Sequence, residues 1–439
     1  MRCETLHPAS APSLGGGLGR GYSMYLDYEK IGDKFKFGKE FFYNLKVWQN
    51  LNYIKKNQKN VLKKLKNKNP LNVVFYVYDE TKWKSWSVYN RMKEYERFNP
   101  KIVVTKNCAP EGNPNYQTAE DVKKCCDYFK NRGVQAEFGY DIEKNEFIPF
   151  EKFSPDIIIY SHPWYVYKTQ GPVMCSRFAL TYYIPYFIPA SEQWHEYGLR
   201  FHSYIFGHFV PTETVREFYS KNMPNKGKSL RVAGHPVFDE LTENGGEKKY
   251  IIYAPHWTVC GDNLRFGTFD WSGYKILEFA KLHKELNWVF RPHPLLYKFL
   301  LTSGFMSKEE ADNYYNEWKN TGILSEGGDY TDLFSKSYAM ITDCGSFLTE
   351  YFVTGNPVIH LISDKFTPNP LTKQIDEVYY GAHNTEEMDG FLAEVILNKN
   401  DYKKQERCEL LQKLNLHNIC SGKRIIDIIL SDIGESNGQ

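Results

Sequence analysis

From residue 70 onward, short apolar runs rich in β-branched and aromatic residues alternate with segments whose apolar residues recur every three or four positions. The runs predict buried strands and the periodic segments predict helices between them. In the first half we expect strands at 72–79, 101–106, 134–140 and 155–161, with helices at 86–98 and 117–133. This alternation is typical of a doubly wound α/β sheet with parallel strands.

The second half of the chain repeats the pattern. We expect strands at 247–257, 288–294, 338–343 and 357–362, with helices at 274–287, 306–322 and 346–355. Residues 192–222 look helical, and 229–241 begin with a new strand and turn. We therefore predict two Rossmann-like domains facing a cleft, at 70–228 and 229–439, with the chain crossing between them near 226–246. No short-period repeat is present, which excludes solenoids and propellers.

The segment at 23–69, which precedes the first predicted domain, is strongly basic. Residues 30–69 hold twelve lysines against Asp33 and Glu40, a local charge of +10. We predict a basic amphipathic helical arm with apolar stripes formed by Phe41, Leu45, Trp48, Leu51, Leu62 and Leu65. One interpretation is an arm lying on anionic lipid. The other is a solvated helix docked on the following domain.

Composition narrows the class of protein. Of 439 residues, 42% are hydrophobic and 25% are charged, which is typical of a folded protein and excludes general disorder. A net charge of +2 gives no overall attraction to nucleic acid, so we expect no such partner. Nine cysteines without a C-x-x-C spacing favour a reducing cytosol over a disulfide framework or a zinc site.

Neither export nor a membrane span is expected from the sequence. The first 22 residues read as a flexible tail without the apolar core of a signal peptide. The longest weakly charged stretch, 178–191, is shorter than a spanning helix and contains Pro185 and Pro189.

Three motifs of the second half follow predicted strands, at the edge where open parallel sheets bind ligands. They are Tyr-Ala-Pro-His-Trp at 253–257, Arg-Pro-His-Pro at 291–294 and Thr-Asp-Cys-Gly-Ser at 342–346. In the last, we expect Ser346 to cap a helix whose free N–H groups and dipole bind phosphate. Glu350, one turn further on, would face ribose hydroxyls. The alternative is a plain helix cap with Glu350 on the surface.

Histidines and basic residues complete the candidate site. His293 is held between two prolines, and His256 follows the first strand of the second domain. Arg265 is a basic residue near these loops. It is a candidate for binding a phosphate, and the alternative is a plain surface charge. In the first half, His162 follows a strand and His202 lies in a helical segment; either is a candidate general base or a structural histidine.

Several motifs are missing from the chain. It has no G-x-x-x-x-G-K-S/T loop, no H-E-x-x-H and no D-x-D after a strand. We therefore expect neither a metal nor a cofactor. A leaving diphosphate would be handled by a helix dipole, histidine and lysine or arginine alone.

The three motifs, together with 329–361, resemble those of the CDP-glycerol:poly(glycerophosphate) glycerophosphotransferase family, the teichoic-acid and capsule polymerases of GT-B fold. The resemblance covers roughly 230–365. The family's Y-A-P-T-W appears with His256 in place of threonine, its H-P as His293-Pro294 and its T-D-Y-S-S as 342–346. The typical W-H-G motif, whose histidine acts as catalytic base in the family, is absent.

The resemblance implies a division of labour between the two domains, with the acceptor bound by 70–228 and the nucleotide by 229–439. CDP-glycerol or another CDP-alcohol would be the donor and a polysaccharide or lipid-linked polymer the acceptor. His162 or His202 would replace the missing base, and His293 would act on the leaving CMP. The resemblance implies that His293, Asp343, Ser346 and Glu350 contact the CDP-alcohol. His256, Arg265, Thr342 and Gly345, from the same loops, complete the predicted binding residues.

The basic arm would then hold the enzyme on the inner face of the bacterial cell membrane. Two alternatives stay open at this point. One is a GT-B glycosyltransferase that uses a nucleotide sugar, and the other is a non-catalytic relative that keeps the nucleotide cleft.

Overall fold

The structure is a computed structural model that describes residues 36–113, 115–192, 198–243, 247–259 and 266–435. The predicted tail at 1–22 and the first part of the arm therefore lie outside the described residues. The chain divides into two units, 1–49 and 50–439, and both sheets belong to the second unit. Within the described residues, no helix is both long and apolar enough to cross a bilayer.

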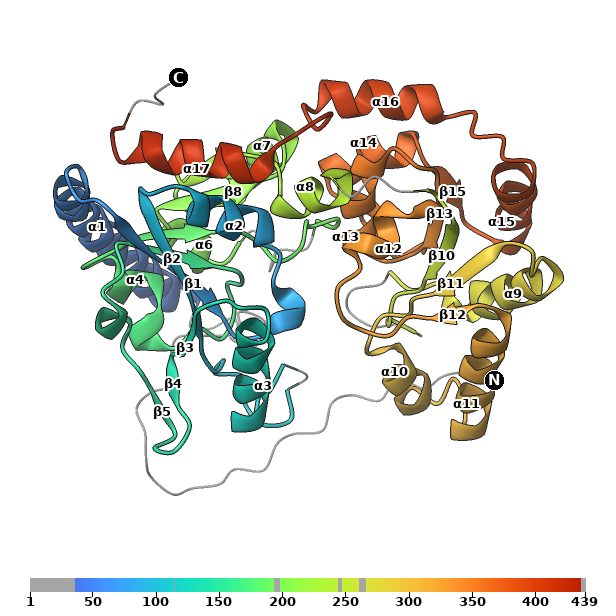
Figure 1. Ribbon diagram of the computed structural model, residues 1–439, viewed down its shortest axis with the longest axis horizontal. Helices are drawn as coiled ribbons and strands as arrows, with labels where there is room; N and C mark the ends of the chain where they lie inside the picture. Colours follow the sequence, from blue (N-terminus) through green and yellow to red (C-terminus); the bar gives the residue numbers. More distant parts are fainter. Residues whose placement is uncertain (1–35, 114, 193–197, 244–246, 260–265, 436–439) are drawn as a thin grey trace. The chain divides into compact units, whose positions relative to one another are not determined.

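The first half of the 50–439 unit is built on a seven-stranded sheet in which every neighbouring pair is parallel (Figure 1). Its order is β3-β2-β1-β6-β7-β8-β9. The strands are β1 (Leu71–Val77), β2 (Phe98–Val104), β3 (Ala136–Phe138), β6 (Ile157–Tyr160), β7 (Leu180–Tyr183), β8 (Gly207–Val210) and β9 (Leu230–Val232). A small antiparallel pair, β4 (Tyr140–Asp141) and β5 (Glu146–Phe147), extends from it.

Helices cover both faces of this sheet, which explains why its strands are almost continuously apolar. One face packs on α2 (Trp86–Glu94), α3 (Ala119–Lys130), α17 (Ser421–Asp432) and the end of α1 (Lys36–Leu65). The other face packs on α4 (Pro172–Cys175) and α6 (Arg200–Tyr204). A capping box between Thr118 and Asp121 fixes the start of α3. The helix α7 (Glu213–Asn222) joins β8 to β9.

The second half contains a six-stranded sheet, again with parallel neighbours throughout. Its order is β12-β11-β10-β13-β14-β15, so both sheets have the Rossmann winding in which the strand order reverses beside the first strand. The strands are β10 (Tyr250–Ala254), β11 (Asn287–Phe290), β12 (Ile323–Leu324), β13 (Ser337–Thr342), β14 (Val358–Leu361) and β15 (Tyr380–Ala382).

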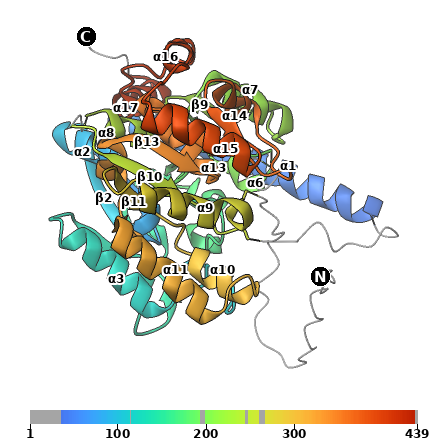
Figure 2. The same ribbon diagram turned by 90° about the vertical axis from the view of Figure 1, so that its right-hand side faces the viewer.

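Two helical layers also cover this second sheet. One layer, whose helices lie in the foreground of Figure 2, contains α9 (Phe269–Leu282), α10 (Leu296–Thr302), α11 (Lys308–Thr321) and α15 (Thr385–Phe391). The opposite layer contains α8 (Pro236–Glu243), α12 (Thr331–Ser335), α13 (Gly345–Glu350), α14 (Pro370–Glu377) and part of α16 (Lys404–Lys413). Successive strand residues such as Ile251 and Ile252 enter different cores because side chains alternate along a strand.

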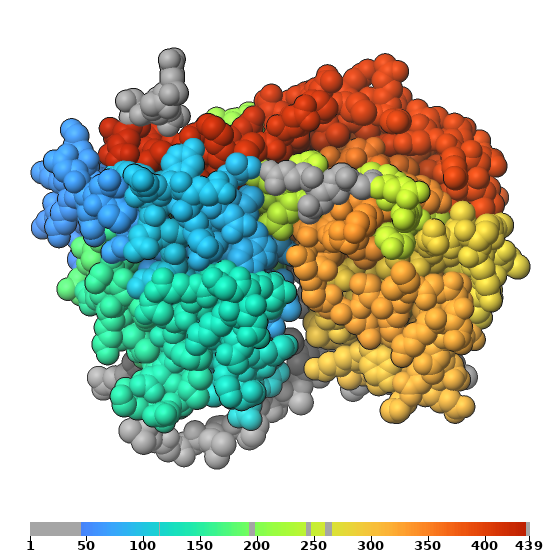
Figure 3. Space-filling model, viewed as in Figure 1, coloured from blue at the N-terminus to red at the C-terminus, as the bar shows by residue number. Residues whose placement is uncertain are grey.

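The end of the chain returns to the first half. In Figures 1 and 3 the red helices α16 and α17 follow one another across the top of the molecule. Ile425, Ile426 and Ile429 of α17 are buried in the same core as Val88 and Tyr89 of α2. The carboxyl-terminal helix is therefore part of the first half, although the sequence assigned all of 229–439 to the second.

Two further expectations differ from the structure. The predicted boundary at 229 assigns β9 to the second domain, but β9 pairs with β8 in the first sheet. The prediction of helix over 192–222 is wrong at β8, because Phe209 and Val210 are buried strand residues beside β7 and β9. A four-residue strand is too short for its period to be recognised.

The apolar stripe predicted for the arm is also wrong in part. Val61 and Leu65 are buried in the first core, whereas Leu45 and Trp48 are exposed, with 37% and 62% of their surface accessible. The end of α1 is docked through polar contacts as well, since Asn57 donates a hydrogen bond to Ser176 Oγ at 3.2 Å. Residues 50–65 are therefore docked on the following domain, which is the second of the two alternatives.

Candidate functional site

The site is built around the switch point of the second sheet, between β10 and β13. Ligands of doubly wound sheets bind beyond the carboxyl ends of the strands at such a point. His256 follows β10 and Asp343 follows β13, and the two strands are neighbours in parallel register. The Tyr-Ala-Pro-His-Trp and Thr-Asp-Cys-Gly-Ser motifs, nearly ninety positions apart, thus meet at one sheet edge. β11 is β10's other neighbour, and the loop after it brings His293 to the same edge.

Asp343 is buried, and its carboxylate accepts hydrogen bonds from two residues of the segment that follows β10. Its Oδ1 accepts the N–H of His256 at 2.6 Å, and its Oδ2 accepts the N–H and hydroxyl of Thr268 at 2.7 and 2.9 Å. Burial raises the pKa of Asp343 to about 6, against the lowering effect of these hydrogen bonds. The carboxylate thereby joins the loop at His256 to the start of α9, and the ligand contact predicted for Asp343 stays a prediction.

His256 and His293 face each other with ring centroids 5.2 Å apart. The Nδ1 of His293 accepts the N–H of Leu295 at 3.1 Å, and the Nδ1 of His256 accepts the N–H of Thr258 at 3.3 Å. Burial lowers the pKa of His293 to about 4 and that of His256 well below its ordinary value. Both rings are therefore neutral near pH 7 with the proton on Nε2, so each offers one N–H donor.

The loop after β13 leads into α13, which begins one residue earlier than predicted. Cys344, rather than Ser346, occupies the N-cap position, and Ser346 is the second residue of the helix. The Thr342 hydroxyl donates to the carbonyl of Ala254 at 2.6 Å and accepts the N–H of Cys344 at 2.9 Å. The first-turn N–H groups of a helix have no partner within the helix, and they belong here to Gly345 and Ser346.

Gly345 is required by close packing at this helix start. A Cβ atom at this position would lie 2.6 Å from the ring of Phe266 and 3.1 Å from the Cβ of Ala190. Because Ala190 belongs to the first half, the helix start of the second half lies against the segment that follows β7. Thr349 continues this contact by donating its hydroxyl hydrogen bond to the carbonyl of Ile188 at 3.1 Å.

Glu350 is buried, contrary to the surface alternative, and it is not open to a ribose in this arrangement. Its Oε2 accepts the hydroxyl of Tyr330. Burial raises the pKa of Glu350 to about 7, although the charge of Lys84 acts in the lowering direction. The Nζ of Lys84, from the first half, lies 4.0 Å from the centroid of the Tyr330 ring.

Arg291 is, after Lys84, the second cation near the Tyr330 ring. It is not among the predicted site residues. Its guanidinium donates to the Ser325 hydroxyl at 2.7 Å and to the carbonyl of Gly328 at 2.8 Å, and its Cζ lies 5.3 Å from the Tyr330 ring centroid. Its position directly before Pro292-His293 was the sequence signal for it. Lys84 offered no comparable signal because its partners belong to the other half of the chain.

The first sheet has its own switch point, between β1 and β6. His162 follows β6 and is fully buried, with its ring centroid 3.5 Å from that of Tyr78, which follows β1. Its Nδ1 lies 3.2 Å from Ser161 Oγ, while its Nε2 has no hydrogen-bond partner in the described structure. Burial lowers the pKa of His162 well below its ordinary value. A cavity of about 240 Å³ adjoins, with Tyr78 and Lys82 in its lining.

The structure does not bring His202 and His162 together. His202 lies on α6, before β8, and its ring stacks on that of His208 with centroids 4.9 Å apart and planes 16° apart. Tyr219 packs on the His208 ring, with ring centroids 5.7 Å apart. This is the environment of a core histidine. His235, in the segment where the chain crosses between the halves, packs with its Nε2 2.7 Å from the carbonyl of Pro185.

Two residues of interest lie outside the described residues. Arg265, a predicted phosphate contact, is one of them. The other is His195, because Trp194-His195 matches the first two letters of the W-H-G motif. The described residue just before this segment, Glu192, pairs with Lys373 of the second half at 3.0 Å. Throughout the described ranges, no group of three or more His, Cys, Asp or Glu side chains is arranged to hold a metal ion.

The sequence matches no protein-family model and no curated protein. Solved structures do match. The wall teichoic acid polymerase TagF aligns at 15% identity over 92% of this chain and 99% of its own, with a TM-score of 0.53. The UDP-GlcNAc 2-epimerase from Neisseria meningitidis, bound to UDP-GlcNAc, aligns at 15% identity over 82% of this chain and 100% of its own, with a TM-score of 0.51.

An S. aureus MnaA structure with UDP is similar at 13% identity over 84% of this chain and 99% of its own, with a TM-score of 0.51. The two parallel sheets and these matches identify the fold of the chain as GT-B, as predicted. At such identities the likeness concerns the fold alone.

Proposed function

We propose that the chain transfers glycerol phosphate, or another polyol phosphate, from a CDP-alcohol to a hydroxyl of a cell-surface polymer and releases CMP. The observation that carries the proposal is the convergence of three family-like motifs at one switch point. They contribute the N–H donors of His256 and His293 and the helix start at Gly345. Such donors suit a diphosphate, because hydrogen bonds from N–H groups stabilise the negative charge of its oxygens.

In the proposed reaction the acceptor oxygen attacks the β-phosphorus of the donor. The new bond joins that oxygen to phosphorus, and the bond between phosphorus and the bridging oxygen breaks, so CMP leaves with the electron pair. His293 and the first N–H groups of α13 would stabilise the charge that develops on CMP. Arg291 lies directly before this loop and supplies a positive charge.

The acceptor proton needs a base, for which the chain offers two candidates in the first half. His162 follows β6 and has a free Nε2 in a buried position. His195 is supported by the partial W-H motif alone. The solved structures that match include a TagF variant with histidine replaced by asparagine and soaked with CDPG, so the same substitution is a natural test here.

We also propose that the first half takes the acceptor, that the second takes the donor, and that the chain works at the inner face of a bacterial cell membrane. The described lysines of α1 support this location, since Lys55, Lys56, Lys59 and Lys63 are all exposed. A docked helix with an outward basic face suits an anionic lipid surface.

The second candidate function uses a nucleotide sugar. It is favoured by the similarity to the 2-epimerase bound to UDP-GlcNAc and to MnaA with UDP. The same donors would bind the diphosphate, but reaction would occur at the sugar rather than at phosphorus.

The deciding experiment measures CMP release from CDP-glycerol, CDP-ribitol and a panel of nucleotide sugars, with membrane lipid as acceptor. We expect CMP from a CDP-alcohol only, and its loss in His293→Ala. His162→Asn and His195→Asn would identify the base, and His202→Asn serves as the control for a packed histidine. UDP or another nucleoside diphosphate formed from a nucleotide sugar would favour the second function. Nucleotide binding without turnover would favour a non-catalytic relative.

A further inference from the structure

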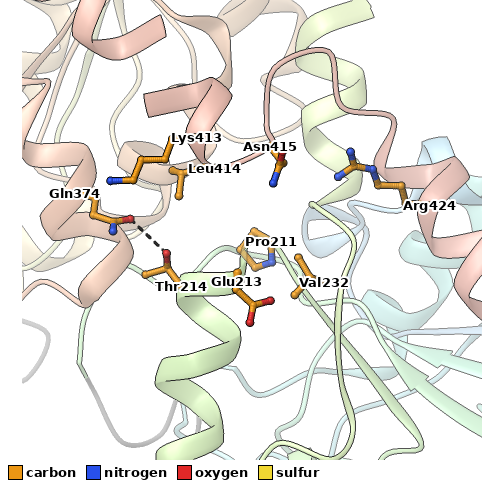
Figure 4. Close-up of a pocket in the computed structure, with 9 residues that line it drawn as sticks. All are labelled: Pro211, Glu213, Thr214, Val232, Gln374, Lys413, Leu414, Asn415 and Arg424. Carbon is orange, nitrogen blue, oxygen red and sulfur yellow. Dashed lines mark hydrogen bonds between the residues drawn. The ribbon is translucent and has the colours of Figure 1, made fainter. Parts of the chain in front are cut away.

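A cavity of about 450 Å³ lies where the chain crosses back from the second half to the first (Figure 4). We call it the crossover pocket. Pro211 and Val232, at the ends of β8 and β9, and Leu414, at the end of α16, supply its apolar wall. The pocket shares no lining residue with the switch-point sites described above, and the proposed function leaves it without a role.

Four side chains in the lining carry hydrogen-bond donors that are not used within the described parts of the chain. Lys413 and Asn415 come from the end of α16, Arg424 from the first turn of α17 and Gln374 from α14. Gln374 uses its side-chain oxygen alone, which accepts the hydroxyl of Thr214 at 3.3 Å (Figure 4). Its amide N–H groups, the amide of Asn415 and both cations have no protein acceptor there.

The charge balance of the pocket is positive. Glu213 is the one acidic residue in the lining, and its carboxylate pairs with Arg216 on the next turn of α7. That partner offsets its charge, whereas Lys413 and Arg424 have none. The pocket also lies at the beginning of α7, a ten-residue helix whose amino-terminal end is favourable to anions.

We propose that the crossover pocket binds a small organic phosphate. A phosphate group suits this donor set because arginine, lysine and amide N–H groups are its common partners in proteins. The volume exceeds that of a single phosphate ion, and the wall formed by Pro211, Val232 and Leu414 would take the organic part. Since the lining includes residues of both halves of the 50–439 unit, a bound ligand stabilises the contact between them.

The test is a titration of the full chain by calorimetry with glycerol 3-phosphate, CMP and inorganic phosphate, with glycerol as the uncharged control. Hydrogen exchange measured with each probe locates the binding, because ligand in the crossover pocket protects the amides of 411–424. We expect an organic phosphate to bind and to give this protection, and glycerol to give neither.

The matched variants separate the crossover pocket from general charge effects. Lys413→Gln with Arg424→Gln should lower affinity at least about tenfold and remove the protection, since two charged hydrogen bonds are lost. Lys404→Gln, which removes a positive charge at the other end of α16, should leave both unchanged. Gln374→Ala is a milder second variant. Protection confined to 254–258 and 291–296, no binding, or equal weakening by Lys404→Gln would overturn the proposal.

Discussion

The carboxylate of Asp239 on α8 accepts the backbone N–H of Ser421 at 2.6 Å and thereby caps a helix that follows it by more than 180 positions. Its second oxygen accepts the N–H of Gly422 at 2.8 Å. Asp239 is fully buried, and Gly422 lies against Ser87 of α2 with no space for a Cβ. This one side chain therefore fixes where α17 begins and how it rejoins the first half.

Asp239→Ala should lower the free energy of unfolding by about 2 kcal/mol, because two buried N–H groups lose a charged acceptor at a helix start. Urea denaturation followed by circular dichroism measures the change. Asp427→Ala, which removes the surface partner of Lys423 on the same helix, is the control and should shift the midpoint little. Equal shifts for both variants would contradict the capping role.

Much of the architecture could be predicted from the sequence, and the reason is physical. The strands at 72–79 and 338–343 lie between two helical layers, so nearly every position is apolar and the runs are easily recognised. β8 gave no such signal in four residues that include His208. The packing of α17 on the first sheet could not be predicted either, because an amphipathic stripe identifies a helix but not the core that it enters.

Gly345→Ala should weaken donor binding and lower stability by about 1–3 kcal/mol, because the added methyl group meets the Phe266 ring and Ala190 at the start of α13. Nucleotide affinity and thermal unfolding are the two measurements. Gly390→Ala is the matched control: it lies in α15 with nothing within 4 Å of the new Cβ. A helical glycine replaced there should leave stability equal or slightly higher. If Gly345→Ala behaves like Gly390→Ala, the close packing at α13 is not important.

The sequence predicts where the residues of the candidate site lie along the chain, but it does not predict which side chains they contact. Residues 342–346 do lead from a strand into a helix, since that pattern is local. The use of Asp343 depends on Thr268, and the burial of Glu350 depends on Tyr330 and Lys84. These partners are distant in the sequence, and only the folded chain brings them together.

Glu350 makes the stability of the chain depend on pH in a specific direction. Burial raises its folded-state pKa to about 7 from the ordinary 4.5, so between these values the folded chain holds a proton that the unfolded chain has lost. The stabilising contribution is complete below about pH 4.5 and declines as the pH rises toward 7. It amounts to about 3 kcal/mol across the range.

Glu350→Gln should therefore flatten the fall in stability between pH 4.5 and 7.5, and its free energy of unfolding relative to the wild type should rise with pH. Urea denaturation at several pH values gives the two curves. Asp343, with a pKa raised to about 6, contributes equally to both curves and cancels in the difference. An exposed control, Glu217→Gln, should leave the curve of the wild type unchanged. Parallel curves for Glu350→Gln and the wild type would exclude the pKa shift.

The lysines of α1 lead to a prediction about membranes. Val61 and Leu65 hold this helix on the first core, so Lys55, Lys56, Lys59 and Lys63 are left to the solvent. Positions 55, 56, 59 and 63 recur on one helical face by their spacing, opposite to that of 61 and 65. Changing all four to glutamine should weaken binding to vesicles that contain anionic lipid by about 100-fold or more, at about 1 kcal/mol for each lysine near the surface.

Vesicle co-sedimentation at two salt concentrations measures the effect, because electrostatic binding declines with salt. The control replaces four exposed lysines elsewhere, Lys123, Lys298, Lys319 and Lys404, which gives the same change in net charge. If the control variant loses as much affinity as the α1 variant, then total charge rather than the α1 face determines binding. If the wild type binds neutral and anionic vesicles equally, the basic face has no electrostatic role at the membrane, and the proposed location loses its main support.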